Sequence, residues 1–256
     1  QMVKYLLKKS YLQKDLKEVP FKDLWNNNGV FTTMWIYGNP PKILFFNSHI
    51  TNLIKSLKVF KILKKNTQKN ILNLIKKNID KKTKYDHLLR VALDKKLISI
   101  SLRKKIKTST NFSLNIINHK RFKPEFKNLK YKIILKHLSK LNPAKEDIGL
   151  SVNNKILETG TSNLIFVSNN KIYSPLNKFY KGVNLKFFEK KVKIIKKNIF
   201  LKDLINFEEI ILIGSGKSVT SVKSINQFKW KRRSIKVYGK LKNIFETEAK
   251  KKKYFY

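Results

Sequence analysis

Apolar residues in the first eighty positions change between two spacings, one typical of strands and one typical of helices. Residues 30–37 are rich in β-branched and aromatic side chains and stop at a Gly-Asn-Pro-Pro sequence. This predicts a strand, a turn and a return strand near residues 43–46. Residues 50–60 and 68–79 carry apolar side chains at helical spacing with lysines between them, which predicts two amphipathic helices. Asn47-Ser48 is the expected N-cap of the first helix.

The remainder of the chain is predicted to be rich in strands. Asn153-Asn154 and residues 168–170, Ser-Asn-Asn, separate short apolar runs, which predicts two tight hairpins. The strand at residues 209–213 leads into a Gly-Ser-Gly-Lys-Ser loop. Further strands are predicted over residues 87–93, 97–102 and 112–117, and helices over 184–195 and 234–250.

The polar stretch at residues 105–111 has few side chains that could pack, which is typical of a domain boundary. We therefore predict a small N-terminal α+β domain over residues 1–108 and a larger C-terminal domain over residues 112–256.

The chain has 58 basic and 16 acidic residues among 256, a formal net charge of +42. Only five of the basic residues are arginines, and the lysines are spread along the whole sequence. Because arginine makes the bidentate contacts of specific nucleic-acid recognition, this pattern favours compositional drift over a specific nucleic-acid site. Weak adhesion to polyanions is still expected.

Several classes of protein are disfavoured by residue types. The chain has no cysteine, which excludes disulfides and thiolate metal sites, and its four histidines lack metal-ligand spacing. It has no apolar run of membrane-spanning length and no signal-peptide pattern near its start. We expect a cytoplasmic protein with no metal and no membrane contact.

Six segments resemble motifs of the class IV aminotransferases, the fold-type IV pyridoxal phosphate enzymes, and they occur in the family's order. Residues 157–163, Leu-Glu-Thr-Gly-Thr-Ser-Asn, resemble the family's Glu-Gly-Thr-Thr-Ser-Asn and are the most specific match. Residues 135–141, Leu-Lys-His-Leu-Ser-Lys-Leu, resemble the lysine motif of the lyase branch, Leu-Lys-His-Leu-Asn-Arg-Leu. The weaker matches are residues 28–33, 49–53, 182–184 and 214–219.

The resemblance implies an α+β, two-domain fold of the D-amino acid aminotransferase type, with a small N-terminal α/β domain and a larger C-terminal pseudo-barrel domain. It also implies pyridoxal 5'-phosphate as cofactor, a small amino-acid-like substrate and a homodimer. The two-domain division above agrees with that expectation.

The same resemblance assigns the central chemistry to Lys136 and Glu158. Lys136 matches the lysine that binds the cofactor aldehyde covalently and later carries a proton, for which its amine must be neutral. Glu158 matches the carboxylate that keeps the pyridine nitrogen protonated, so that the ring can accept electrons. Lys132, Lys140 and Lys145 are alternatives for the lysine.

Other matched residues are expected to bind the cofactor or the substrate. Backbone N–H groups before the helix predicted at residue 184 suit a phosphate, and a serine loop between glycines suits close approach to one. The expected cofactor-binding residues are Glu158, Ser162, Asn163, Gly182, Val183, Asn184, Ser215 and Gly216. The expected substrate-binding residues are Thr32, Thr33 and Arg90.

The loop at residues 214–218 also ends in Gly-Lys-Ser, as a nucleotide-binding P-loop does. Its two glycines are only two positions apart, where the P-loop requires five, so nucleotide binding is not expected there.

Two features of the chain, one residue and the length of one segment, depart from the family pattern. Asn52 stands where relatives have an arginine that holds the cofactor phosphate. The segment from Lys136 to Glu158 has room for only one or two helical turns, and Pro143 interrupts it.

Within the family, Thr32-Thr33 and the Lys136 motif favour 4-amino-4-deoxychorismate lyase, which expels pyruvate to give 4-aminobenzoate. The alternatives are a branched-chain or D-amino acid transaminase, and a catalytically impaired member or basic binding protein on the same scaffold.

Overall fold

The structure is a computed structural model that describes residues 5–251 of the chain. Within them the chain forms two compact units. The first comprises residues 5–105 and 126–132, and the second comprises residues 106–125 and 133–251. The return of residues 126–132 to the first unit has no counterpart in the predicted division at residue 108.

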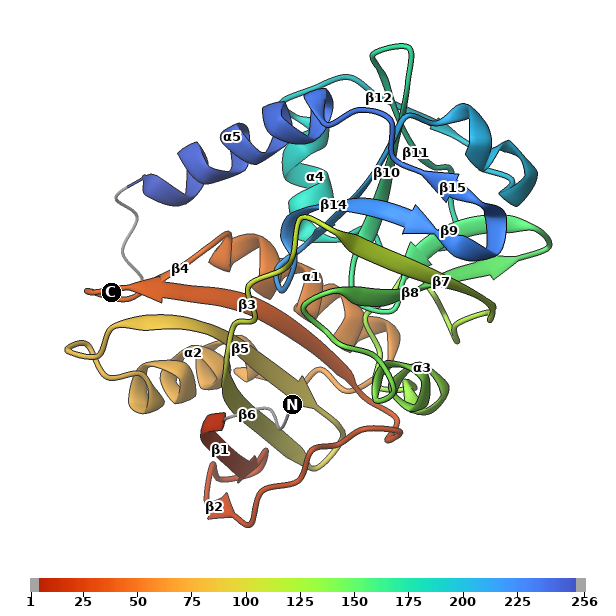
Figure 1. Ribbon diagram of the computed structural model, residues 1–256. Coiled ribbons are helices and arrows are strands. Elements are labelled where there is room, and N and C mark those ends of the chain that lie inside the picture. Colours follow the sequence, from red (N-terminus) through yellow and green to blue (C-terminus); the bar gives the residue numbers. More distant parts are fainter. Residues whose placement is uncertain (1–4, 252–256) are drawn as a thin grey trace. The chain divides into compact units, whose positions relative to one another are not determined.

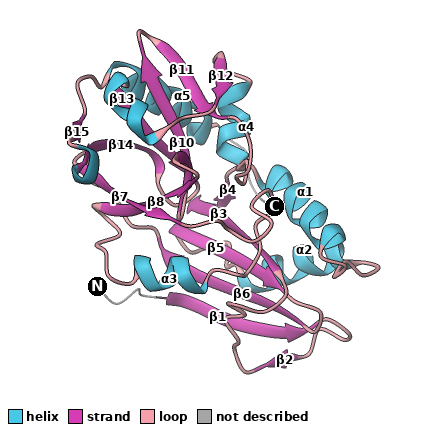
Figure 2. Ribbon diagram, turned by 90° about the vertical axis from the view of Figure 1, so that its right-hand side faces the viewer, coloured by secondary structure: helices cyan, strands magenta, loops and turns pink. Residues whose placement is uncertain are grey.

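The first unit is built on a six-stranded antiparallel sheet with strand order β2-β1-β6-β5-β3-β4. Its two helices lie together beside the sheet (Figure 2), and α1 packs on β3. The elements are β1 (Tyr5–Leu12), β2 (Glu18–Val19), β3 (Val30–Gly38), β4 (Lys42–Ile43), α1 (Phe46–Val59), α2 (Thr67–Asn78), β5 (Tyr85–Leu93) and β6 (Leu97–Lys104).

The core of this unit follows from the two periodicities that the sequence shows. Met34 and Ile36 lie on one face of β3, and they share a core with Leu53 and Leu57 of α1 and Ile71 of α2. The two predicted helices are thus confirmed, with small shifts of their ends.

The predicted N-cap of α1 is wrong. The helix begins at Phe46, after Phe45 in the left-handed conformation at φ 55°, and it has no side-chain cap. The chain turns into the helix immediately after β4, which leaves Asn47 and Ser48 inside the first turn.

The second unit is built on a nine-stranded mixed sheet that the chain visits out of sequence order. Its path is β12-β11-β10-β13-β14-β7-β8-β9, and β15 pairs with β14. The strands are β7 (Phe112–Asn118), β8 (Glu146–Val152), β9 (Lys155–Thr159), β10 (Asn163–Ser168), β11 (Lys171–Pro175), β12 (Ile194–Lys197), β13 (Glu209–Gly214), β14 (Ser218–Ile225) and β15 (Trp230–Lys231).

Helices of the second unit are α3 (Lys132–Leu138, begun by the last residue of the first unit), α4 (Val183–Glu189) and α5 (Lys236–Lys250), with 3₁₀ turns at Leu201–Asn206 and Asn226–Phe228. Helix α4 packs on β13, and helix α5 packs on β14 and β13. Figure 1 shows α4, α5 and β14 of this unit. Among residues 5–251, no helix is long and apolar enough to cross a membrane.

Both predicted hairpins of the second unit are confirmed. Asn153 and Asn154 connect β8 to β9 with φ of 50° and 58°, and Asn169 and Asn170 connect β10 to β11 with φ of 50° and 59°. Asparagine tolerates this left-handed conformation, which the tight hairpin turns require.

The predicted helix over residues 184–195 is wrong in its second half. Helix α4 ends at Glu189, and Ile194–Lys197 forms β12, which pairs in parallel with β11. Local spacing favoured a continued helix, whereas pairing with a distant strand decides the outcome.

Helix α5 receives its N-terminal cap from another element. The Glu209 carboxylate of β13 accepts hydrogen bonds from the backbone N–H groups of Val237 and Tyr238 at 2.9 and 2.8 Å, and from the Ser234 hydroxyl at 2.9 Å. A buried anion at the positive end of a helix satisfies donors that the helix cannot satisfy itself.

We predict that Glu209→Leu destabilises the protein by about 3 kcal/mol, because it removes the acceptor of one buried and two partly buried donors. Urea unfolding followed by circular dichroism measures the change. Glu246→Leu on the exposed side of α5 is the matched control, with an expected change of about 0.5 kcal/mol or less. Equal stability of the two variants would show that the Glu209 contacts do not support α5.

Candidate active site

A tightly bonded turn joins β9 to β10 and carries the best-matched motif. The Thr159 hydroxyl donates to Asp147 at 2.9 Å, and the Thr161 hydroxyl donates to the same carboxylate oxygen at 2.5 Å. Backbone N–H groups of Ser162 and Ile148 donate to the Thr159 hydroxyl and to Asp147, both at 2.8 Å. The turn therefore holds Glu158 at one end and Asn163 at the other.

Asp147 is fully buried beneath this turn. Burial raises the pKa of its carboxyl group, and the positive charge of Lys217 together with the hydroxyl and amide donors acts in the opposite direction. A short side chain with several donors around it can anchor both sides of a turn at once.

Glu158 forms a buried ion pair with Arg121, which follows β7. Arg121 Nη1 lies 3.1 Å from Glu158 Oε2, and the two side chains are only 3% and 6% exposed. The other fork nitrogen, Nη2, donates to the Pro124 carbonyl at 3.1 Å. The hydrogen bonds to Glu158 and to the Pro124 carbonyl come from one planar guanidinium, so together they fix the orientation of the Arg121 side chain relative to Glu158.

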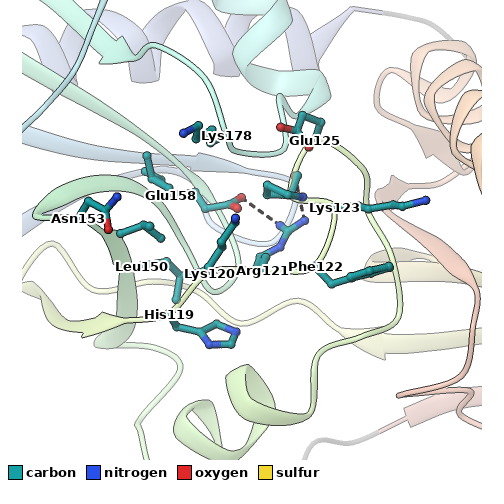
Figure 3. Close-up of a pocket in the computed structure, with 13 residues that line it drawn as sticks. His119, Lys120, Arg121, Phe122, Lys123, Glu125, Leu150, Asn153, Glu158 and Lys178 are labelled. Atoms are coloured by element: carbon teal, nitrogen blue, oxygen red, sulfur yellow. Dashed lines mark hydrogen bonds and ion pairs between the residues drawn. The ribbon is translucent and has the colours of Figure 1, made fainter.

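The ion pair faces a cavity of about 660 Å³, a volume typical of small-molecule sites. Figure 3 shows the Glu158 carboxylate and the Arg121 guanidinium pointing toward one another among the lining side chains. Leu150 and Leu157 supply apolar lining, and the other basic lining residues are His119, Lys120, Lys123 and Lys178. Burial lowers the pKa of His119, and the nearby positive charges of His137 and Arg121 act in the same direction.

The other end of the turn meets the start of α4. Asn163 Oδ1 accepts a hydrogen bond from the Gly182 N–H at 2.9 Å, and Asn163 Nδ2 donates to the Tyr180 carbonyl at 2.6 Å. A Cβ atom at Gly182 would lie 2.7 Å from Asn163 Oδ1, so a side chain at this position would displace the Asn163 carboxamide. The amide nitrogen of Asn184, the second residue of α4, is buried and has no hydrogen-bond partner among residues 5–251.

The serine loop after β13 lies beside the same turn. Gly214 approaches Ser162 so closely that a Cβ atom there would lie 3.0 Å from the Ser162 hydroxyl. Ser215 and Gly216 are half-exposed, whereas Lys217 is buried. The predicted cofactor-binding residues at positions 162, 163, 182 and 184 and in the serine loop are thus gathered at one end of the sheet.

Lys217 shows why this loop differs from a P-loop. Its ammonium group donates to the Pro143 carbonyl at 2.8 Å and lies 4.4 Å from the centre of the Phe112 ring. A P-loop lysine reaches a phosphate, whereas the ammonium group of Lys217 is held inside the second unit.

Lys136 is exposed on α3 and is not among the residues that line the cavity. Ile134 of the same helix is buried beside Gly160 of the anchored turn. Two positions along a helix rotate a side chain by roughly 200°, so Lys136 lies on the side of α3 away from that turn. Its assignment as the reactive lysine stays a prediction.

The predicted substrate-binding residues lie in the first unit, on two faces of its sheet. The Thr32 hydroxyl lies 3.0 Å from Nδ1 of His49 on α1. Thr33 points to the opposite face, where it pairs in register with Arg90 of β5. Arg90 forms an ion pair with Asp23, and its guanidinium lies 3.7 Å from the centre of the Trp25 ring.

A family profile for amino-transferase class IV matches residues 29–225. The chain belongs to this family. The match spans the anchored turn, the start of α4 and the serine loop, which are the regions described above. A comparison with curated proteins gives no match.

Solved structures show that this class IV chain has the predicted fold. The branched-chain aminotransferase of the thermophilic archaeon Thermoproteus uzoniensis, solved with norvaline, has a TM-score of 0.76 at 15% identity over 96% of each chain. The T.th. branched-chain amino acid aminotransferase, complexed with N-(5'-phosphopyridoxyl)-L-glutamate, has a TM-score of 0.75 at 14% identity over 96% of each chain. A candidate 4-amino-4-deoxychorismate lyase of Legionella pneumophila has a TM-score of 0.69 at 17% identity, over 86% of this chain and 91% of that chain.

These matches confirm the α+β, fold-type IV class that the motifs implied. Two residues that hold Glu158 and the anchored turn were not identified from the sequence, Arg121 and Asp147. Arg121 carried one usable signal, because it is one of five arginines in a chain whose basic residues are otherwise lysines. Asp147 carried none, since only the folded turn shows how many donors surround it.

The buried ion pair predicts a non-additive response to mutation. Arg121→Met or Glu158→Leu alone is expected to destabilise the protein by about 3–5 kcal/mol, because each leaves an uncompensated buried charge. The double variant is expected to recover most of that loss, since an apolar pair avoids the desolvation penalty. Chemical unfolding of the four proteins without added ligand tests this, and additive single effects would contradict it.

His49 predicts a dependence of stability on pH. Burial, followed by the positive charge of Lys127, lowers its pKa from 6.5 to about 3. The unfolded chain then binds a proton that the folded chain does not, so stability falls as pH decreases from about 6.5 toward 3. The slope is at most about 1.4 kcal/mol per pH unit.

His49→Gln should remove this part of the pH dependence, as measured by urea unfolding between pH 7 and pH 4. The control is Thr32→Val, which removes the hydroxyl next to His49 and keeps the imidazole, so the slope should persist. An unchanged slope in His49→Gln would show that His49 is not the group that titrates.

Proposed function

We propose that this class IV chain is a pyridoxal 5'-phosphate enzyme and, within the family, a 4-amino-4-deoxychorismate lyase. The observation that supports pyridoxal 5'-phosphate as the cofactor is the anchored turn between β9 and β10. It holds a buried carboxylate, Glu158, at one end and a group of phosphate-compatible donors at the other. A phosphate and a ring nitrogen lie at opposite ends of this cofactor.

The residues present fit the cofactor at its phosphate end. The buried side-chain amide of Asn184 has a donor without a partner among residues 5–251, and an anion bound at the start of α4 could accept from it. The proposed binding set is Glu158, Ser162, Asn163, Gly182, Val183, Asn184, Ser215 and Gly216. Asn52 cannot supply the positive charge of the family arginine, so the neutral donors would hold the phosphate in a generally positive protein field.

When bound, the cofactor acts as an electron sink for bonds broken at the substrate amino carbon. Glu158 would hold a proton on the ring nitrogen. Lys136 is the residue proposed to bind the aldehyde and to carry the proton from the substrate carbon. The anchored turn would keep the carboxylate and the phosphate donors at a fixed separation.

The lyase hypothesis is supported by the residues that line the cavity and by the lysine motif at residues 135–141. Five of the seven charged or titratable lining residues of the cavity are basic, which suits a ring substrate that carries carboxylates better than a branched alkyl side chain. Solved structures similar to the chain include branched-chain aminotransferases, so transamination is the second outcome of the test.

The decisive experiment loads the purified protein with pyridoxal 5'-phosphate and reduces it with borohydride. Peptide mass spectrometry then identifies the modified lysine. We expect Lys136 to carry the label and Lys136→Ala to lose the visible absorbance of the bound cofactor, with Lys240→Ala on α5 as the control. Labelling of a lysine in the cavity, such as Lys178, would overturn the assignment of Lys136, and no uptake would overturn the function.

The reaction is tested on the same loaded protein. Release of pyruvate from 4-amino-4-deoxychorismate without a 2-oxo acid supports the lyase. Amino transfer that requires 2-oxoglutarate instead identifies a transaminase.

A further inference from the structure

The buried Arg121–Glu158 pair is the most unusual feature of the cavity. Both partners are nearly inaccessible, and Arg121 is also bonded to the Pro124 carbonyl. The lysines of the cavity, by contrast, are exposed at positions 120, 123 and 178. Arg121 is therefore the basic group of this cavity that is held in one place.

Stability alone does not account for such a pair. Removing two charges from water costs several kcal/mol per ion, and an apolar pair of similar volume is often at least as stable. A pair that lies in the wall of a cavity, however, controls how much negative charge the cavity presents to a ligand. This role needs both partners, and the structure has both Arg121 and Glu158 in the wall of the cavity.

The pair would affect a ligand nitrogen in two ways. The guanidinium favours the ionised form of Glu158 and restrains its rotation, which keeps a proton acceptor in place. It also occupies one carboxylate oxygen and opposes a second positive charge nearby. A ring nitrogen that binds Glu158 must therefore share the carboxylate with Arg121.

We propose that Arg121 is a positioning residue of the cofactor site that fixes Glu158 and, by sharing its charge, limits how strongly Glu158 holds a proton on the cofactor ring nitrogen. This inference rests on the proposed function and goes beyond it, because it assigns control of the electron sink to a residue that the sequence motifs do not include. Arg121 acts through Glu158 and needs no contact with the substrate.

The test measures the ring nitrogen directly. Wild-type protein and variants are loaded with pyridoxal 5'-phosphate labelled with ¹⁵N in the ring, and the ¹⁵N chemical shift is followed against pH. Arg121→Met should move the protonation midpoint upward by about one pH unit or more, because a nearby positive charge has been removed. Arg121→Lys keeps the charge and should stay near the wild-type midpoint.

Two further variants keep the test decisive. Arg233→Met removes an exposed arginine from the second unit, where it donates to the Ile205 carbonyl, and should leave the midpoint unchanged. If Arg121→Met does not fold, Arg121→Gln, which keeps a neutral donor, should show the same upward shift.

The outcomes separate this inference from the proposed function. A wild-type protein that takes up no cofactor overturns the function and, with it, the inference. A loaded wild type whose midpoint equals that of Arg121→Met and Arg121→Gln, or exceeds it, overturns the inference alone. Circular dichroism of each variant before loading excludes a general loss of structure as the cause.

Discussion

The second unit depends on the carboxylate of Asp147, which fixes the turn between β9 and β10. Hydroxyl groups of Thr159 and Thr161 and the Ile148 N–H all donate to it. Burial penalises a charged Asp147, as its raised pKa indicates, and these donors together with Lys217 offset part of that penalty. The net effect is a rigid turn, because any rotation of the turn would leave Asp147 without its donors.

Rigidity of this turn has a direct consequence for the site. Glu158 precedes the turn and Asn163 follows it, so a single anchor sets the positions of the carboxylate and of the residue that binds Gly182. Sites built on anchored elements hold their geometry better than sites on free loops. The anchored turn thus connects Glu158, which lines the cavity, to Asn163, which binds the start of α4 and is not among the lining residues of the cavity.

The buried acidic residues of the protein are distributed differently from its lysines. Among the described residues, the buried acids are Asp147, Glu158 and Glu209, and all of them belong to the second unit. Each has a defined set of partners, whether threonines, an arginine or the start of α5. The lysine excess is spread over the surface, where substitutions cost little, whereas each buried acid is tied to one structural task.

Local sequence signals were sufficient for the elements whose conformation is decided locally. The Asn-Asn turns of two hairpins and the amphipathic helices α1 and α2 follow from backbone preference and periodicity. The strand Ile194–Lys197 could not be predicted in this way, because its pairing with β11 decides it. The partner of Glu158 was also beyond local reasoning, since 37 positions separate it from Arg121.

The connection between Lys136 and Glu158 is short, and it affects the anchored turn and the position of Lys136 differently. Helix α3 has only seven residues, and the chain enters β8 at Glu146 after Pro143. The connection still supports the site, because the Pro143 carbonyl receives the Lys217 ammonium group near Asp147, and Ile134 packs beside Gly160. A shortened segment can thus preserve the anchored turn while α3 leaves Lys136 exposed and outside the lining of the cavity. The anchored turn therefore fixes Glu158 and Asn163, whereas Lys136 lies on the exposed side of α3 and is not held by that turn.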